Sequence, residues 1–420
     1  MLSLLRVRNF KSIGDSGVEL HPKPLTLLMG PNGSGKSSIL EAVCILSQSV
    51  RQQDFVFDGR LIRYENQHSI LHKKEENRIV SITVGFIPPV FNISPWPMAM
   101  DSKPAELAGA YSKRINPYEV TQSAFANRNE IATIEFSSAA GSRVIAPPPY
   151  RGYSPNSDAR FIMNPSSFVV PQNVQTFQDA QSIIQVVGEG LRHVYFLSAV
   201  RGDSESFLNA QTGINPDWVG PKGEHTPHIL AKFFSLRENQ EREELVVKWA
   251  ERLGLALFKA GWVGGTRLDS DYQDPILGTY LRTPLASYGS RQILAILAQL
   301  FASPPGSLLM IEEPEISLHP ESQMLLPELF AEAIRREVQV VITTHSIFLP
   351  LSLWRPIESG SLKHDQIAVY HVTKEKEGSR VEEIPVTDKG FLAKWVPSFT
   401  KAEEKSIKDL LKLAPQGPSQ

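Results

Sequence analysis

The feature that most constrains this chain is the run Gly30-Pro31-Asn32-Gly33-Ser34-Gly35-Lys36-Ser37. It fits the pattern G-x-x-x-x-G-K-[ST], follows an apolar run from Leu25 to Met29 and precedes a helical pattern that ends near Ser49. Glycines let the backbone curl so that its N–H groups converge on phosphate oxygens, and the helix N-terminus adds partial positive charge. The sequence therefore predicts a buried strand, a phosphate-binding loop and a helix in succession.

The polar groups of this loop have expected roles in binding a nucleoside triphosphate. Lys36 would reach the β- and γ-phosphates, and the Ser37 hydroxyl would ligate Mg²⁺. A glycine-rich turn with a chance lysine is the alternative, but it does not explain the flanking strand and helix. The candidate ATP-binding residues are Gly30, Pro31, Asn32, Gly33, Ser34, Gly35, Lys36, Ser37 and Ser38.

A second apolar run, from Leu308 to Ile311, ends in the adjacent acids Glu312 and Glu313. Glu312 would hold Mg²⁺, directly or through water, and Glu313 would polarise the attacking water as general base. An exposed acidic turn is the alternative interpretation. The phosphate loop in the same chain favours the metal site.

A histidine, His345, follows the β-branched run from Val338 to Thr343. With the run at 307–311 and a helical pattern over 320–337, this predicts a parallel strand–helix–strand unit. The carboxyl ends of such strands form a ligand-binding rim, where His345 could contact the γ-phosphate or orient water. A lone histidine is otherwise commonly a satisfied structural residue.

A fourth motif, Ser287-Tyr288-Gly289-Ser290-Arg291-Gln292, opens a predicted helix that ends near Ala302. Small hydroxyl residues and a glycine at a helix N-terminus can form a second anion site. Because the phosphate loop already wraps one side of the triphosphate, this second site suggests a γ-phosphate that arrives from another subunit. An ordinary helix N-cap is the alternative. The candidate contacts are Ser287, Gly289, Ser290 and Gln292.

In this order, the four motifs resemble those of ABC-type ATPase heads, in the branch that contains RecF, the SMC proteins and the OLD-family ATPases. The run Asn9-Phe10-Lys11-Ser12-Ile13 is similar to the N-terminal strand motif of that branch, and Leu318-His319-Pro320 to its dimer-contact loop. The segments 195–201 and 219–224 are similar to the prokaryotic OLD-like subgroup. The resemblance covers roughly 1–50 and 190–372.

This resemblance implies an α/β P-loop NTPase fold with a mixed or parallel core sheet and a helical subdomain. It also implies ATP and Mg²⁺ as cofactors and a homodimer or higher oligomer, with each ATP between Lys36 of one subunit and Ser287 and Gly289 of the other. OLD nucleases carry a fused Toprim domain, for which the segment after His345 is too short. We therefore expect a separately encoded effector such as a nuclease, nucleic acid as a candidate ligand, and a setting in anti-phage defence.

Three departures from the family pattern stand out. The segment from Ser287 to Gln292 lacks the second adjacent glycine of the transporter signature, and Glu312 stands where aspartate is commoner. The glutamine loop is not assigned to one residue; Gln52, Gln53, Gln67 and Gln122 are its candidates.

Residue patterns divide the chain into four expected parts. These are an N-terminal ATPase lobe at 1–50, its completion with an irregular proline-rich insertion at 51–190, a C-terminal ATPase lobe at 191–372, and a strand and helix extension at 373–420. The prolines of 88–171 exclude a long coiled coil, because proline breaks the helical ladder. Asp269, Asp271 and Asp274 are interpreted as a solvated loop.

Composition narrows the function classes. The formal net charge is −2, which neither demands nor excludes nucleic acid. The single cysteine, Cys44, excludes an internal disulfide framework, and no apolar run reaches the ~20 residues that span a bilayer. We expect a soluble cytoplasmic ATPase with no membrane partner. An ATP-binding assembly scaffold with negligible hydrolysis is the alternative, whereas a GTPase is disfavoured because the sequence has no N-K-x-D motif.

Overall fold

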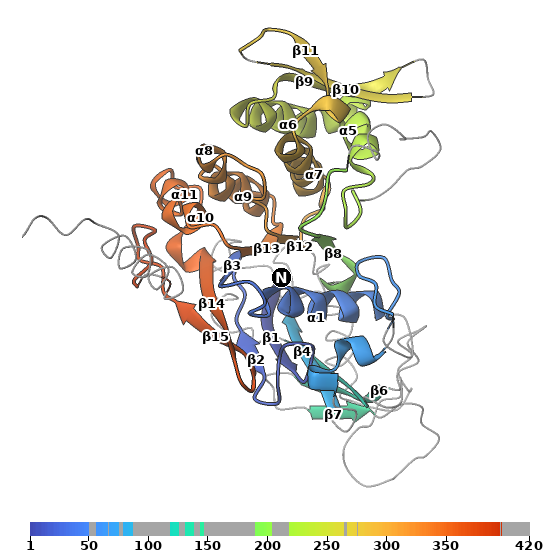
Figure 1. The fold of residues 1–420 in the computed structure, drawn as a ribbon, viewed down its shortest axis with the longest axis vertical. Helices are drawn as coiled ribbons and strands as arrows, with labels where there is room; N and C mark the ends of the chain where they lie inside the picture. The colour runs from blue at the N-terminus through green and yellow to red at the C-terminus, as the bar shows by residue number, and fades with distance from the viewer. Residues whose placement is uncertain are drawn as a thin grey trace, which may run out of the picture.

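The chain forms two lobes stacked along its long axis in a computed structural model (Figure 1). The structure describes residues 1–49, 56–65, 67–74, 79–86, 118–125, 131–137, 143–146, 190–203, 218–263, 267–274, 276–394 and 396. In that part, three β-sheets carry the strands, two of them in the lower lobe and one in the upper.

The sheet that carries the predicted motifs lies at the centre of the molecule and has the strand order β15-β14-β3-β13-β12-β8. All strands except β15 run parallel. Every residue of β3 and β13 is buried, as expected for parallel strands covered on both faces. The bounds are β3 (Leu25–Met29), β8 (Val194–Leu197), β12 (Leu308–Glu312), β13 (Gln339–Thr344), β14 (Ile367–Glu375) and β15 (Gly378–Ile384).

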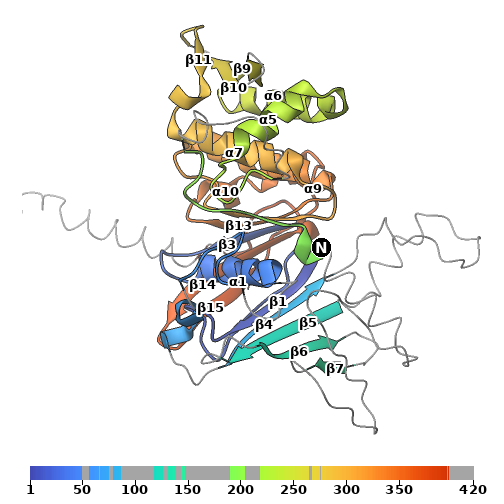
Figure 2. The same ribbon diagram turned by 90° about the vertical axis from the view of Figure 1, so that its right-hand side faces the viewer.

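Helices cover both faces of this central sheet. Helix α1 (Lys36–Ser49) lies between it and a second, antiparallel sheet, and α9 (Leu326–Arg335) packs on the opposite face against β13 and β3 (Figure 2). The antiparallel sheet has the order β2-β1-β4-β5-β6-β7. Its strands are β1 (Leu2–Arg8), β2 (Val18–Leu20), β4 (Ile79–Phe86), β5 (Tyr118–Phe125), β6 (Ile131–Ser137) and β7 (Arg143–Ala146).

The upper lobe combines helices with a small sheet of order β11-β10-β9. Helices α5 and α6 pack against β9, and α7 connects them to the central layer (Figures 1 and 2). The bounds are α5 (Thr226–Ser235), α6 (Gln240–Arg252), β9 (Ala256–Val263), β10 (Arg267–Gln273), β11 (Tyr280–Arg282) and α7 (Tyr288–Ala302). Three short helices, α8 (Pro320–Gln323), α10 (Phe348–Leu351) and α11 (Trp354–Glu358), complete the region beside α9.

Several predicted elements differ from the structure. The spacing of apolar residues over 226–260 predicts a helical segment, whereas the structure has two helices, α5 and α6, and the residues from Ala256 onward form β9. The helix expected over 320–337 is two helices, α8 and α9. The interpretation of Asp269 and Asp271 as loop residues is wrong: both lie in β10, where Asp269 accepts a hydrogen bond from Arg282 at 3.0 Å.

The insertion and the C-terminal segment are described in part. The sequence of this insertion predicts short strands near 79–87 and 131–136, and β4 and β6 confirm them. The expected boundary at 372 falls inside β14, which continues to Glu375 and pairs with β15. Gln52, Gln53, most of the proline-rich segment and the helix expected near the C-terminus lie outside the described residues. In the described ranges, no helix is long and apolar enough to cross a membrane.

Candidate functional site

The phosphate loop connects the end of β3 to the start of α1. Gly30, Gly33 and Gly35 have φ angles of 152°, 72° and 108°, which L-residues with a side chain rarely adopt. A Cβ atom on Gly30 would lie 2.0 Å from the Val372 carbonyl oxygen of β14. The loop therefore depends on glycine both for its curl and for its close approach to the neighbouring strand.

Lys36, the first residue of α1, turns its side chain back over the loop. Its ammonium donates to the carbonyl oxygens of Gly30 at 2.9 Å and Pro31 at 3.0 Å. Burial lowers the pKa of Lys36 to about 8, against the opposing effect of the carboxylates of Glu313, Glu315 and Glu312. Lys36, the only charged residue from Gly30 to Ser37, is thus folded back onto the carbonyls of its own loop.

Glu312 is the last residue of β12 and lies beside the start of α1. Its carboxylate accepts hydrogen bonds from the Ser37 hydroxyl and, at 3.3 Å, from the Ala199 N–H. Burial raises the pKa of Glu312 above its ordinary value, and the Ser37 hydrogen bond partly offsets this effect. The two groups predicted to share a cation, Ser37 and Glu312, are therefore in contact.

Glu313 turns away from the sheet at the next position. Its φ is 45°, a left-handed conformation that is uncommon for a residue with a side chain, and its N–H donates to the Thr343 carbonyl at 2.9 Å. One carboxylate oxygen lies 3.4 Å from Nε2 of His345. Burial, and secondly the Lys36 ammonium, lower the pKa of His345, which leaves the imidazole neutral near pH 7.

The fourth motif begins α7 in the upper lobe. Ser287 caps this helix, since its hydroxyl accepts from the Ser290 N–H at 3.1 Å, and both serines reach the surface. Gly289 packs tightly on the loop after β12: a Cβ there would lie 2.2 Å from the Ser317 carbonyl oxygen. Gln292 differs from the two serines, because it is 1% exposed and its amide donates to the Ala199 carbonyl of its own chain at 3.4 Å, so it does not face the surface that they reach.

Comparisons with known proteins agree with this geometry. A family model described as "AAA ATPase domain" matches residues 1–161, and one described as "AAA domain, putative AbiEii toxin, Type IV TA system" matches residues 223–352. Together these two matches span the phosphate loop, the acidic strand end and His345.

Two curated relatives are the "DNA replication and repair protein RecF" of Salmonella typhi, 33% identical, and that of Erwinia tasmaniensis, 34% identical, each over 84 residues. Each alignment covers 20% of this chain and 23% of the relative. The fold is similar to a solved Smc head bound to the C-winged helix domain of ScpA, with a TM-score of 0.51, 11% identity and coverage of 91% of this chain and 98% of that one. Together these findings support an ABC-type P-loop ATPase head of the RecF/SMC branch.

The ATPase head offers a fitting but incomplete set of ligands for Mg²⁺. Ser37 and Glu312 supply a hydroxyl and a carboxylate, and the described residues contain no group of three or more His, Cys, Asp or Glu side chains that could hold a metal ion by themselves. Mg²⁺ commonly takes one or two protein ligands plus phosphate oxygens and waters. The buried Ser34 hydroxyl has no partner in the described structure, which fits a loop built to contact a phosphate.

Glu315 is a residue of the head that the sequence analysis did not assign. Its buried carboxylate accepts from the Thr344 hydroxyl at 2.7 Å and from the N–H groups of His345 at 2.7 Å and Ser346 at 3.1 Å. This carboxylate fixes the backbone that carries His345. The sequence signals this role only through a third acid in Glu312-Glu313-Pro314-Glu315, because the partners of Glu315 lie at the end of β13 and in the residues after it.

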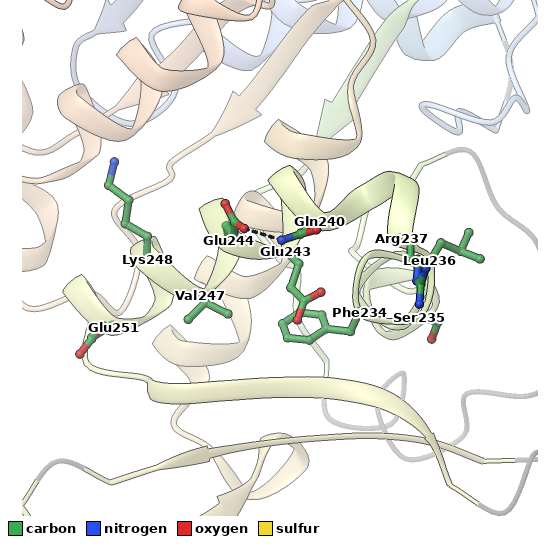
Figure 3. A pocket seen from close by; sticks show the side chains of 10 residues that line it. All are labelled: Phe234, Ser235, Leu236, Arg237, Gln240, Glu243, Glu244, Val247, Lys248 and Glu251. Carbon is green, nitrogen blue, oxygen red and sulfur yellow. Dashed lines mark hydrogen bonds between the residues drawn. The ribbon is translucent and has the colours of Figure 1, made fainter.

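A cavity of about 660 Å³ lies in the upper lobe (Figure 3). It is lined by Phe234 at the end of α5, by Arg237 in the turn that follows, and by residues of α6 such as Glu244. It is open and contains charges of both signs, and Gln240 donates to Glu244 one turn further along α6 at 3.0 Å. It is not connected to the phosphate loop through its lining residues.

The dependence on Gly30 gives a first prediction. We expect Gly30→Ala to lower the free energy of unfolding by about 2–4 kcal/mol, because its methyl group would meet the Val372 backbone. Gly33→Ala is the matched control, since Gly33 also has a positive φ but has no atom within 4 Å of an added Cβ, and should cost only about 1–2 kcal/mol. Urea unfolding measures both; equal losses would contradict the packing argument.

The pKa of Lys36 gives a second prediction, for ATP affinity. The ammonium is charged below its pKa of about 8 and neutral above it, so ATP affinity should be constant near pH 7 and fall about tenfold per pH unit above pH 8. Fluorescence titration with an ATP analogue at pH 7, 8 and 9 measures this. Lys36→Arg is the control, because its side chain stays charged over the whole range and should give a flat profile; a flat profile for the parent would refute the assignment.

Proposed function

We propose that this ATPase head is an ATP-dimerised switch that hydrolyses Mg²⁺-ATP at sites shared between two copies of the chain. One observation supports the chemistry above all: Lys36, Ser37, Glu312, Glu313 and His345 converge at the carboxyl ends of β3, β12 and β13. Ligands of parallel α/β sheets bind at this edge.

Each side chain has one part in the proposed reaction. Lys36 and the glycine-rich backbone bind the β- and γ-phosphates, and Ser37 with Glu312 would hold Mg²⁺, which neutralises charge on the phosphate oxygens when bound. Glu313 accepts a proton from the attacking water, and the neutral imidazole of His345, 3.4 Å from Glu313, orients that water or donates to the γ-phosphate.

Sharing of the site between subunits rests on the start of α7. Ser287 and Ser290 lie at the N-terminus of a 15-residue helix and reach the surface, so they are open to an anion from outside the chain. Within the described ranges, the hydroxyls of these two serines hydrogen-bond to each other rather than to the phosphate loop of the same chain. A second copy that approaches this surface would present the triphosphate bound to its own phosphate loop to Ser287 and Ser290.

The mass of the hydrolysis-deficient variant Glu313→Gln tests this proposal. We expect a monomer without nucleotide and a dimer with saturating Mg²⁺-ATP in sedimentation velocity or light scattering. The parent protein should return to the monomer as ATP is consumed. If Glu313→Gln binds ATP and stays monomeric, the shared site is wrong.

We also propose a separately encoded effector, such as a nuclease, as the partner, with anti-phage defence as the setting. Two comparisons support this proposal. One matching family is described by the words "putative AbiEii toxin, Type IV TA system", and the similar Smc head is bound to a domain of another protein, ScpA. Nucleic acid has weaker support, because Arg6, Lys11 and Arg336 are paired with Glu19, Glu41 and Glu241. A salt-dependent shift with DNA or RNA would support a nucleic-acid ligand, and its absence with and without ATP would remove it.

A further inference from the structure

Arg201 is a buried charge next to the acidic strand end, and neither the motifs nor the proposed reaction explains it. It is 1% exposed and lies four residues after the end of β8. Burying a guanidinium is costly unless its donors are satisfied. Among the described residues its Nε has no hydrogen-bond partner, so the surroundings do not satisfy every donor of the guanidinium.

The partners of Arg201 are backbone carbonyls rather than carboxylates. Nη1 donates to the Ser198 carbonyl at 2.7 Å and to the Glu312 carbonyl at 2.6 Å, and Nη2 donates to the Glu313 carbonyl at 3.0 Å. Burial lowers the pKa of Arg201 to about 10, and the charges of Glu315, Glu312 and Glu313 oppose this effect by favouring the cation. The guanidinium is therefore charged at neutral pH.

Two of these carbonyls flank the Cα atom of Glu313. The Glu312 carbonyl belongs to the peptide plane before that Cα, and the Glu313 carbonyl to the plane after it. The relative orientation of these planes is what the φ and ψ angles of Glu313 describe, and its φ is 45°. A non-glycine residue keeps such a conformation only where its surroundings fix it, and such residues gather at active sites.

We infer that Arg201 is a positioning residue for ATP hydrolysis: by binding the Glu312 and Glu313 carbonyls with one planar guanidinium, it holds Glu313 in the left-handed conformation that directs its carboxylate to His345. This inference rests on the proposed function, because it takes Glu313 as the base of the proposed reaction. It assigns Arg201 no contact with the nucleotide. Glu313 is held from its other side by the Thr343 carbonyl, which accepts from the Glu313 N–H.

The test is Arg201→Lys, which keeps the positive charge but has no planar fork to span carbonyls on two peptide planes. We expect kcat to fall at least about tenfold while KM and the ATP dissociation constant stay within about threefold, because only the alignment of the base is lost. Arg355→Lys is the matched control: Arg355 also donates to an oxygen of its own lobe, that of Glu328 at 3.3 Å, and should retain the parent rate.

A double-mutant cycle separates positioning from general stability. In the Glu313→Gln background the base is already lost, so adding Arg201→Lys should change the single-turnover rate less than about twofold. Equal fold-losses in the parent and in Glu313→Gln would overturn the inference. So would a variant that loses ATP affinity together with kcat.

Folding is monitored by thermal unfolding and by ATP binding. Arg201→Gln, which retains neutral N–H donors without burying an ammonium, replaces Arg201→Lys if the latter does not fold. If neither variant folds, Arg201 is a structural residue and the inference is wrong. A parent chain without ATPase activity would instead refute the proposed function, whereas an active parent with a fully active Arg201→Lys refutes this inference alone.

Discussion

Glu313→Gln is expected to lower kcat for ATP hydrolysis by about 10²-fold to 10⁴-fold, the usual contribution of a general base. The amide is close in size to the carboxylate but cannot accept the proton of the attacking water. ATP affinity should change little, because Lys36 and the glycine-rich backbone make the phosphate contacts. Phosphate release measured at saturating Mg²⁺-ATP gives kcat, and a bound fluorescent analogue gives affinity.

The matched control for this substitution is Glu383→Gln. Glu383 is an exposed carboxylate on β15, in the sheet whose strand β12 ends just before Glu313, and its substitution should retain the parent rate. A Glu313→Gln protein that turns over ATP like the parent would show that another group activates the water. Negligible ATP turnover by the parent and by Glu383→Gln would favour the ATP-dependent scaffold over the switch.

Lys36→Ala is expected to weaken ATP binding about 100-fold or more. The ammonium is the only cation among the loop residues from Gly30 to Ser38, and charged hydrogen bonds of this kind contribute about 1.5–3 kcal/mol each. The loss should be larger for ATP than for adenosine, which has no phosphate for Lys36 to contact. Calorimetry with both ligands measures the difference.

Lys259→Ala serves as the control for lost charge, since Lys259 is an exposed lysine on β9 in the other lobe. It should bind ATP like the parent. Equal weakening of ATP and adenosine by Lys36→Ala would mean that the substitution damages the loop as a whole rather than one phosphate contact.

The sequence predicted those parts of the site in which local chemistry allows few alternatives. A phosphate loop needs glycines at positive φ, and Gly30, Gly33 and Gly35 have it. Parallel strands that are buried on both faces consist almost entirely of apolar residues. The apolar runs of β12 and β13 therefore predicted both strands, and with them the sheet edge at which Glu312, Glu313 and His345 lie.

The remaining parts depend on contacts between distant segments. Glu315 could not be assigned without Thr344 to Ser346, nor Arg201 without the carbonyls of Glu312 and Glu313. The helical interpretation of 226–260 includes the start of β9 (Ala256–Val263), which is a strand because it pairs with β10 and packs on α5 and α6. Gln292 matched a motif position, but the first turn of α7 directs it inward to Ala199.

Mixing two inactive variants tests the shared site most directly. Lys36→Ala removes the phosphate contact, and Ser287→Arg obstructs the start of α7, so each variant alone should be inactive. In an equal mixture about half of the dimers combine one copy of each and carry one intact site of two, which predicts about a quarter of the parent ATPase rate. A mixture as inactive as its components, or a fully active Ser287→Arg protein, would contradict an ATP site built from two copies.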